Sequence, residues 1–416
     1  MERALTVVVA VTALLLTMHP GSAAAQERRF TYTISSQGEV SGDLGHLAAV
    51  AADTLADPRG WSLGGTLRYD RVDSGADFHL ILASPSVVDA AAPICSAKYS
   101  CSVGDDVYIN DVNWRRATPA WTHSIREYQS YVILHEVGHW LDVDHARCPS
   151  AGRLAHVMQQ QSISLNGCLA NVWPVVSERE TVARNQGVSV DWSPVEQKYL
   201  AFGASGGFLG GPVTWERPTI DSRGSHQDYQ GGVIYHSAGT GAHEVHGSIL
   251  DRWRGLGAVT GPLGFPITDE TSTPDRRGRF NHFAGGAGGS VYWTQHTGAR
   301  EVYGDIRERW GSLARKQRQL GYAVTGETPT PDGGGRFNHF AGSAGGSVYW
   351  TPQTGAHEVY GHIRDRWESL GWEQGPLGYP VSGEYAVEGG RRSDFQNGHI
   401  RYDTGTRETE VSIDGD

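Results

Sequence analysis

The stretch His135-Glu-Val-Gly-His-Trp-Leu-Asp-Val-Asp-His145 decides the expected fold of the first half of the chain. His135 and His139 are four residues apart, so on a helix they share one face, with about 5–6 Å between their Cβ atoms. That separation suits two imidazoles on one zinc ion. Glu136 is one residue further round the helix, where it can reach a water on the same ion and accept its proton.

His145 is the expected third ligand. On a continuing helix, six residues at about 100° each would turn it to the far side, so the chain must leave the helix before His145. If it does, three neutral histidines and one water form an open catalytic zinc site rather than a closed structural one.

The pattern His135-Glu136-x-x-His139-x-x-Asp142-x-x-His145 resembles the long zinc signature of the metzincin metallopeptidases. The resemblance implies an α+β catalytic domain with a mixed sheet and an active-site helix. It also implies a methionine turn beneath the zinc, and Met158 is the only methionine after residue 18. Metzincins usually have Gly where this chain has Asp142, because the backbone takes positive φ there, a conformation that Asp accepts at a cost. Asp142 and Asp144 are therefore alternative ligands, or partners that orient a ligand.

A narrower resemblance covers residues from about 30 to 175. The segments Ala56–Trp61, His135–Trp140 and His156–Gln160 resemble an uncharacterised actinobacterial family of secreted metzincin-like domains. This family brings no known substrate.

Residues 26–180 are expected to form one α+β domain around this motif. The expected order is a strand at 30–35, a helix from Asp43 to about 55, strands at 66–72, 78–83 and 107–109, and a second helix at about 124–141. The second helix carries the histidines. Residues 181–192 are expected to form a linker.

After residue 192 the chain repeats itself. Leu-Gly turns begin at Leu209, Leu263, Leu320 and Leu377, at intervals of 54, 57 and 57 residues. Each unit predicts a short helix, a Leu-Gly turn and short strands, and a unit of this size must share its core with its neighbours. The units 193–247, 248–304, 305–361 and 362–416 resemble LGFP repeats, named for the Leu-Gly-Phe-Pro at 263–266. This resemblance implies attachment to the cell wall.

Aromatic residues recur in these units. Tyr292, Trp293, Tyr349 and Trp350 occupy equivalent positions in two of the repeats. They fit two uses, stacking on sugar rings or filling the repeat cores.

The N-terminus predicts export. Residues 1–25 combine Arg3, an apolar run of about 15 residues and small residues before Ala25, which is typical of a secretory signal cleaved after Ala25. The run is shorter than the roughly 20 residues of a spanning helix, and no later stretch is long or apolar enough. We therefore expect a secreted protein, extracellular or associated with the cell wall, without a membrane span.

Export permits disulfides. The four cysteines, Cys95, Cys101, Cys148 and Cys168, allow three pairings, and proximity favours Cys95–Cys101 and Cys148–Cys168. A zinc–thiolate site is the rival use, but the chain has no Cys-x-x-Cys pair. With 35 basic and 46 acidic residues and no basic run, nucleic acid is not an expected partner.

These features predict a secreted zinc metalloendopeptidase. Zn²⁺ is the expected cofactor, Glu136 the general base, a peptide or protein the substrate, and a cell-wall glycan or envelope component the partner of the repeats. Two alternatives stay open. One is a catalytically inactive cell-wall-binding protein with a metal-stabilised N-terminal module, and the other is a zinc amidase acting on wall peptides.

Overall fold

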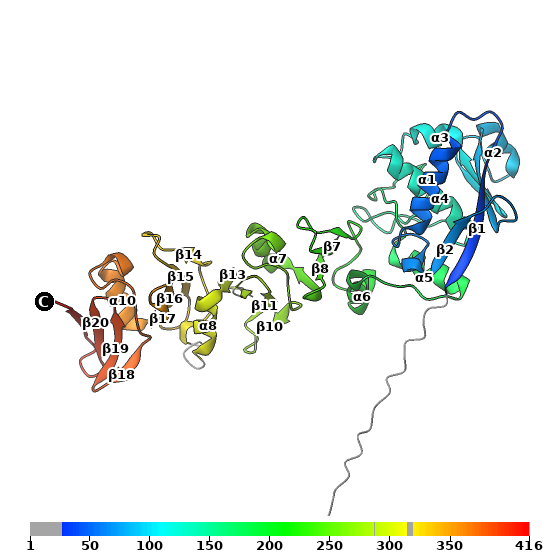
Figure 1. Ribbon diagram of the computed structural model, residues 1–416. Helices are drawn as coiled ribbons and strands as arrows, with labels where there is room; N and C mark the ends of the chain where they lie inside the picture. Colours follow the sequence, from blue (N-terminus) through cyan, green and yellow to red (C-terminus); the bar gives the residue numbers. More distant parts are fainter. Residues whose placement is uncertain (1–26, 287, 314–318, 416) are drawn as a thin grey trace, which may run out of the picture.

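A computed structural model describes residues 27–286, 288–313 and 319–415, and Figure 1 shows their arrangement. The expected signal segment 1–25, with its cleavage after Ala25, lies outside the described residues. Within the described part of the chain, no helix is long and apolar enough to cross a membrane.

The N-terminal half contains a five-stranded sheet in the order β2-β1-β3-β5-β4. Its strands are β1 (Arg28–Gln37), β2 (Leu67–Arg71), β3 (Phe78–Ala83), β4 (Cys101–Val103) and β5 (Asp106–Asn110). All neighbours pair in parallel except β4, which is antiparallel to β5, so the expected mixed sheet is confirmed. The central strand β3 is almost continuously apolar and buried, as a strand with both faces covered requires.

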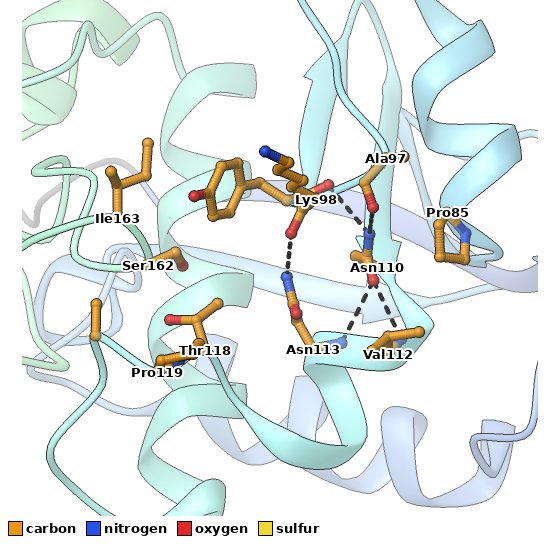
Figure 2. A pocket seen from close by; sticks show the side chains of 12 residues that line it. Pro85, Ala97, Lys98, Asn110, Val112, Asn113, Thr118, Pro119, Ser162 and Ile163 are labelled. Carbon is orange, nitrogen blue, oxygen red and sulfur yellow. Dashed lines mark hydrogen bonds between the residues drawn. The ribbon is translucent and has the colours of Figure 1, made fainter.

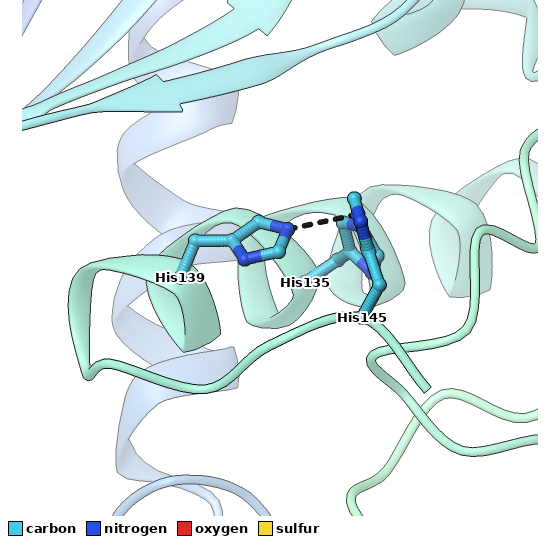
Figure 3. A group of neighbouring side chains, drawn as sticks. All are labelled: His135, His139 and His145. Atoms are coloured by element: carbon cyan, nitrogen blue, oxygen red, sulfur yellow. Dashed lines mark hydrogen bonds between the residues drawn. The ribbon is translucent and has the colours of Figure 1, made fainter. Parts of the chain in front are cut away.

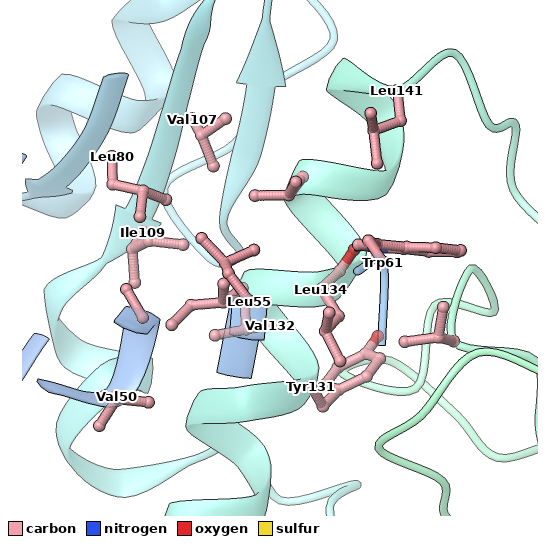
Figure 4. Packing of buried hydrophobic residues seen from close by; sticks show 14 of the residues in the cluster. Val50, Leu55, Trp61, Leu80, Val107, Ile109, Tyr131, Val132, Leu134 and Leu141 are labelled. Carbon is pink, nitrogen blue, oxygen red and sulfur yellow. The ribbon is translucent and has the colours of Figure 1, made fainter. Parts of the chain in front are cut away.

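Two helices cover one face of this sheet. Helix α1 (Leu44–Ala56) begins at Asp43, whose carboxylate accepts a hydrogen bond from the Gly45 N–H, and α4 (Ile125–Trp140) packs beside it. Figure 4 shows Val50 and Leu55 of α1 meeting apolar residues of α4 and of the sheet. Each such aliphatic side chain contributes about 1.5–3 kcal/mol on burial. The short helices α2 (Pro85–Ala91) and α3 (Asp111–Arg116), like strand β4, were not predicted.

Helix α5 (Val176–Gln186) crosses residue 180, the expected end of the first domain. Val182 and Ala183 are buried in the core of the N-terminal domain. Residues 181–186 of the expected linker 181–192 therefore pack with the first domain. The limits 26–180 and 193–416 remain predictions.

The C-terminal half consists of four small antiparallel sheets, each with its strands in sequence order. Figure 1 shows these sheets following one another along the chain. The strands are β6 (Arg217–Pro218), β7 (Gly224–Tyr229), β8 (Gly232–Ser237) and β9 (Gly241–His246); β10 (Thr271–Ser272), β11 (Gly278–Phe283), β12 (Gly289–Thr294) and β13 (Gly298–Tyr303); β14 (Thr328–Pro329), β15 (Arg336–Phe340), β16 (Gly346–Thr351) and β17 (Gly355–Tyr360); and β18 (Tyr385–Val387), β19 (Gly390–Phe395), β20 (Gly398–Asp403) and β21 (Thr409–Ile413). The helices are α6 (Pro194–Ala201), α7 (Gly247–Gly255), α8 (Gly304–Ser312) and α10 (Gly361–Ser369).

The recurring Leu-Gly-Phe-Pro turn has a structural reason at each position, as the second unit illustrates. Leu263 is fully buried, and Gly264 has φ +64°, which favours glycine. The carbonyl of Gly264 accepts a hydrogen bond from the indole N–H of Trp253, at 3.1 Å. Phe265 packs across the seam against Gly224 of the preceding unit, and Pro266 forms a backbone bridge with Phe283.

Consecutive units share their cores, as their size requires. One core combines Val233 and Val245 of the first sheet, Trp253 of α7, and Leu263 and Val291 of the second unit. The aromatic residues left open above lie in or against these shared cores, namely Tyr292, Trp293, Tyr349 and Trp350. The core interpretation therefore accounts for them.

Ion pairs also join each helix that follows one sheet to the next sheet along the chain. Arg252 of α7 holds the buried Glu301 of β13 through both carboxylate oxygens, at 2.5 and 2.7 Å. Arg309 of α8 holds Glu358 of β17 through Oε2, at 2.7 Å from its Nε. Both residues of the second pair are 57 residues further along the chain, so the two helices are attached to the next sheet at equivalent positions.

Candidate metal centre

Helix α4 places the first two histidines. It begins at Ser124 with a capping box, in which the Ser124 hydroxyl accepts from the Glu127 N–H and the Glu127 carboxylate accepts from the Ser124 N–H. Its last turns carry His135 and Glu136, which are buried, and His139, which is half-buried.

Helix α4 ends at a position from which the chain can turn back and bring His145 to the other two histidines. Asp142 has φ +60°, the left-handed conformation expected at that position. The Asp142 N–H donates to the carbonyl of His139 and the Val143 N–H to the carbonyl of Gly138, both at 3.0 Å, which together form a Schellman motif. Asn185 of α5 donates to the Asp142 carbonyl at 3.0 Å and holds the turn. The chain then doubles back and brings His145 to the other two histidines.

The three imidazoles converge on one point (Figure 3). One nitrogen from each of His135, His139 and His145 lies within 4.8 Å of the others, and the Nε2 atoms of His139 and His145 are 3.0 Å apart. Two nitrogens on a tetrahedral zinc with bonds of 2.0–2.1 Å would be about 3.3 Å apart. The three nitrogens could therefore hold one metal ion, and an imidazole donor set suits zinc. His145 is exposed, so the cluster opens to solvent on that side.

Hydrogen bonds from the Nδ1 atoms orient the imidazole rings of His135 and His139. His135 Nδ1 lies 2.8 Å from the carbonyl of Val157, and His139 Nδ1 lies 3.0 Å from the carbonyl of Val143. A carbonyl can only accept, so each Nδ1 carries the proton and each Nε2 keeps a free lone pair. Such contacts are the usual way in which a protein fixes the ring of a metal-binding histidine.

The electrostatics keep the histidines neutral, which is the form that binds metals. Burial, followed by the neighbouring His139, lowers the pKa of His135 to about 3. Burial also lowers the pKa of His139 and of His145, and the charge of Asp144 opposes both shifts.

Glu136 is buried beside the cluster. Burial alone raises the pKa of its carboxyl group to about 8. A general base works best when its pKa lies near the operating pH, so this carboxylate suits proton transfer at neutral pH.

The two candidate aspartates lie at the rim. Asp142 and Asp144 are both exposed, and among the described residues the group able to share one ion contains only the three histidines. Asp142 contributes the turn described above, and Asp144 contributes negative charge near His139 and His145.

Met158 lies beneath α4 and is fully buried. Its carbonyl accepts a hydrogen bond from the N–H of Ala146, at 3.0 Å, so its loop is fixed next to His145. The disulfide Cys148–Cys168 closes this loop, and a second disulfide joins Cys95 and Cys101, which are the two pairings favoured by proximity.

Glu178 of α5 is a residue that sequence reasoning missed. Its buried carboxylate accepts hydrogen bonds from the N–H groups of Met158 (2.8 Å), Val157 (3.0 Å) and Val175 (2.9 Å). Burial raises the pKa of Glu178 to about 7, while these hydrogen bonds lower it. Glu178 therefore holds both the methionine and the carbonyl that orients His135.

A cavity of about 430 Å³ lies against the loop 97–99, which leads into strand β4, and was also not predicted (Figure 2). Asn110 and Asn113 shape it by donating side-chain hydrogen bonds to the carbonyls of Ala97 and Lys98, at 3.0 and 2.6 Å. Ser162, on its opposite wall, is 3.2 Å from the hydroxyl of Tyr128 on α4. The helix that carries the histidines therefore also contacts the wall of this cavity.

Comparisons with known families divide the chain in two. Residues 15–193 match the family described as "Protein of unknown function (DUF3152)". Residues 209–261, 263–317, 320–375 and 377–414 match the LGFP repeat, so the chain carries four LGFP repeats. No curated protein matches the chain.

Among solved structures, an archaemetzincin from Methanopyrus kandleri is 13% identical, with a TM-score of 0.27, over 38% of this chain and 96% of that protein. A protein of unknown function from Bacteroides thetaiotaomicron is 11% identical, with a TM-score of 0.10, over 44% of this chain and 40% of that one. A putative 6-phosphogluconolactonase from Bacteroides uniformis is 11% identical, with a TM-score of 0.10, over 48% of this chain and 54% of that one.

Proposed function

We propose that this protein is a secreted, metzincin-like zinc metalloendopeptidase that its LGFP repeats hold at the cell envelope. The observation that carries the proposal is the convergence of His135, His139 and His145 beside the buried carboxyl group of Glu136. The two disulfides support an extracellular location.

The three histidines would hold the zinc through one nitrogen each. When bound, zinc supplies Lewis-acid chemistry, because it polarises a scissile carbonyl and lowers the pKa of water. Glu136 accepts the proton of the attacking water and passes it to the departing amine. Met158 supports the histidines from below, and Glu178 holds the peptide bonds that orient His135.

An extended peptide is the substrate shape that the surroundings favour. Strand β4 is at the edge of the sheet, pairs only with β5 and lies beside α4. Such an edge offers backbone hydrogen bonds to an added strand. The cavity of about 430 Å³ near Ser162 can receive one side chain of a peptide lying along this edge.

The decisive experiment compares Glu136→Gln with wild type in the expected mature chain, residues 26–416. The variant should keep about one zinc per chain and lose at least about 100-fold in cleavage of a protein or peptide library. Glu127→Gln is the matched control on the same helix, because Gln also supports a capping box, and it should cleave at the wild-type rate.

Other outcomes decide between the alternatives. Equal cleavage by Glu136→Gln and wild type would refute Glu136 as the base. Zinc binding with no cleavage of any substrate would indicate the inactive wall-binding protein, and release of wall amides without cleavage of proteins would indicate the amidase. Attachment is measured separately by co-sedimentation of the full chain with purified walls.

A further inference from the structure

A cavity of about 880 Å³ lies where the N-terminal domain meets the first repeat, and residues of α5, α6 and β7 line it. Its walls come from three parts of the chain, namely 57–64, 154–199 and 212–227. Pockets for organic ligands usually have volumes of about 300–1,000 Å³. None of the lining residues belongs to the histidine cluster, and neither matched family description assigns the cavity a ligand.

Hydrogen bonds between the two parts fix the shape of this cavity. Arg153 Nε donates to the Gln230 side chain at 2.8 Å, and the Leu154 N–H donates to the Pro212 carbonyl at 3.2 Å. On the other side the Asp191 N–H donates to the carbonyl of Leu63 at 2.9 Å. These hydrogen bonds hold the walls of the cavity in place at the junction.

Three tryptophans line it. The guanidinium of Arg59 lies 4.3 Å from the ring centre of Trp173, and that of Arg179 lies 4.6 Å from the ring centre of Trp192, so two of the rings are held in place. Trp215 is half-buried and, among the described residues, has no ring or cation partner. Its flat apolar surface is available to a ligand.

Ion pairs occupy all three arginines of the wall. Arg59 pairs with Asp57 at 2.7 Å, Arg217 with Asp228 at 2.9 Å, and Arg179 with Glu196. The wall also contains Asp191 and Glu216, which belong to no ion pair within the described part of the chain, so no positive charge is left to attract a phosphate. Among the described residues only the three histidines could share a metal ion, so a neutral ligand suits this cavity best.

One polar group of the wall keeps unused hydrogen-bonding capacity. Glu216 accepts from the hydroxyls of Ser193 and Ser225 but belongs to no ion pair within the described part of the chain. The wall thus offers a carboxylate that can accept from further hydroxyls.

We propose that this cavity binds a neutral saccharide. A sugar hydroxyl can donate to Glu216, while the C–H face of the ring packs on Trp215. The proposal rests on the proposed envelope attachment for the source of the sugar, a wall glycan. It deepens that attachment by placing one glycan site at the first repeat, next to the N-terminal domain.

The test is calorimetric titration of the chain 26–416 with soluble wall glycans. The probes are peptidoglycan glycan strands freed of stem peptides, together with galactan and arabinan oligosaccharides. At least one should bind, and Trp215→Ala should weaken that binding by about two- to tenfold, the loss expected for a stacking contact. Glu216→Gln, which keeps the shape of the wall, should also weaken binding. Trp293→Ala, a half-buried tryptophan of the second repeat, should leave binding unchanged. Thermal melting checks that each variant is folded.

Three results of the titrations would refute the saccharide site. The saccharide site is refuted if no glycan binds at millimolar concentration, if both cavity variants bind as well as wild type, or if free stem peptides bind in place of glycans. Co-sedimentation with intact walls then separates the two proposals. Sedimentation without glycan binding in the cavity leaves envelope attachment standing and removes this site, whereas loss of both removes both.

Discussion

The side chain of Met158 lies directly against the backbone of Gly138. A Cβ atom placed on Gly138 would be 2.4 Å from the Met158 sulfur and 3.1 Å from the ring of Trp61. Met158 and Trp61 are both fully buried, so neither can move aside freely. Only glycine at this position lets the methionine loop approach the helix that carries His135 and His139.

The first prediction concerns this contact. Gly138→Ala should lower the free energy of unfolding by about 1–3 kcal/mol, the usual effect of overpacking a core. Gly311→Ala is the control, because Gly311 lies in helix α8 with nothing within 4 Å of its added Cβ. It should be neutral or stabilising by up to about 1 kcal/mol. Urea unfolding of both variants gives the comparison, and equal stabilities would contradict the packing argument.

The second prediction tests the third ligand. His145→Ala should lower the zinc content of the purified chain well below one ion, because it removes one of three converging nitrogens. Mass spectrometry of the metal content measures this directly. Zinc retained at the wild-type level would move the third ligand to Asp142 or Asp144. Asp144→Asn in the His145→Ala background would then identify which of them binds.

The third prediction concerns Glu178. Glu178→Gln should weaken zinc binding about 10–100-fold, because an amide cannot accept from all three backbone N–H groups and the carbonyl that orients His135 loses its support. Glu180→Gln, an exposed neighbour on the same helix, should bind zinc as wild type does. Competition with a chromophoric chelator measures both affinities. An unchanged affinity in Glu178→Gln would show that the loop holds its position without this carboxylate.

The fourth prediction concerns pH and the metal-free protein. Burial raises the pKa of Glu136 from 4.5 to about 8, so a proton on Glu136 stabilises the folded state at low pH. This stabilisation is lost as the pH rises from about 4.5 through about 8. In the presence of a chelator, Glu136→Gln should therefore match wild type near pH 5 and exceed its stability at pH 9. The gain corresponds to about 1.4 kcal/mol for each pKa unit.

Denaturant unfolding at the two pH values tests this sign. A difference between Glu136→Gln and wild type that stays constant from pH 5 to pH 9 would contradict it. Added zinc should shrink the difference at pH 9, because a nearby cation favours the ionised carboxylate.

The fifth prediction concerns the contact between consecutive matched LGFP repeats, in which Arg252 of 209–261 pairs with Glu301 of 263–317. Arg252→Met should lower stability by about 3–5 kcal/mol, because it leaves the carboxylate of Glu301, which is 2% exposed, without its cation. Arg366→Met is the control at the equivalent position of the last unit, where no carboxylate pairs with the arginine in the described residues. It should melt as wild type does, and equal effects at both positions would refute the role of the pair.

Most of the N-terminal fold could be predicted because its long elements carry strong local signals. Asp43 marks the start of α1, and the nearly continuous apolar run of β3 marks a central strand. Strand β4 has three residues and α3 has six, which is too short for hydrophobic periodicity to identify them. Helix α5 has no pronounced apolar face, so its continuation past residue 180 was not foreseen.

Some residues of the candidate site could likewise be predicted from the sequence, and others could not. His135, Glu136 and His139 follow from spacing on a helix, and the exit of the chain before His145 follows from helix geometry. Glu178 gives no such signal, because the two partners that tie it to the site are backbone N–H groups about twenty residues earlier in the chain. The cavity at Trp215 was missed for a related reason, since its walls come from three separate segments, 57–64, 154–199 and 212–227.

The two equivalent ion pairs between consecutive LGFP repeats have a consequence for the number of repeats that the array can contain. Arg252–Glu301 and Arg309–Glu358 are offset by the same 57 residues, so a unit copied between them would find its partners on both sides. Duplication or loss of one such segment of the gene would lengthen or shorten the array without a new interface. The distance between the histidine cluster and the far end of the array is therefore adjustable in whole-module steps, independently of the chemistry at the other end.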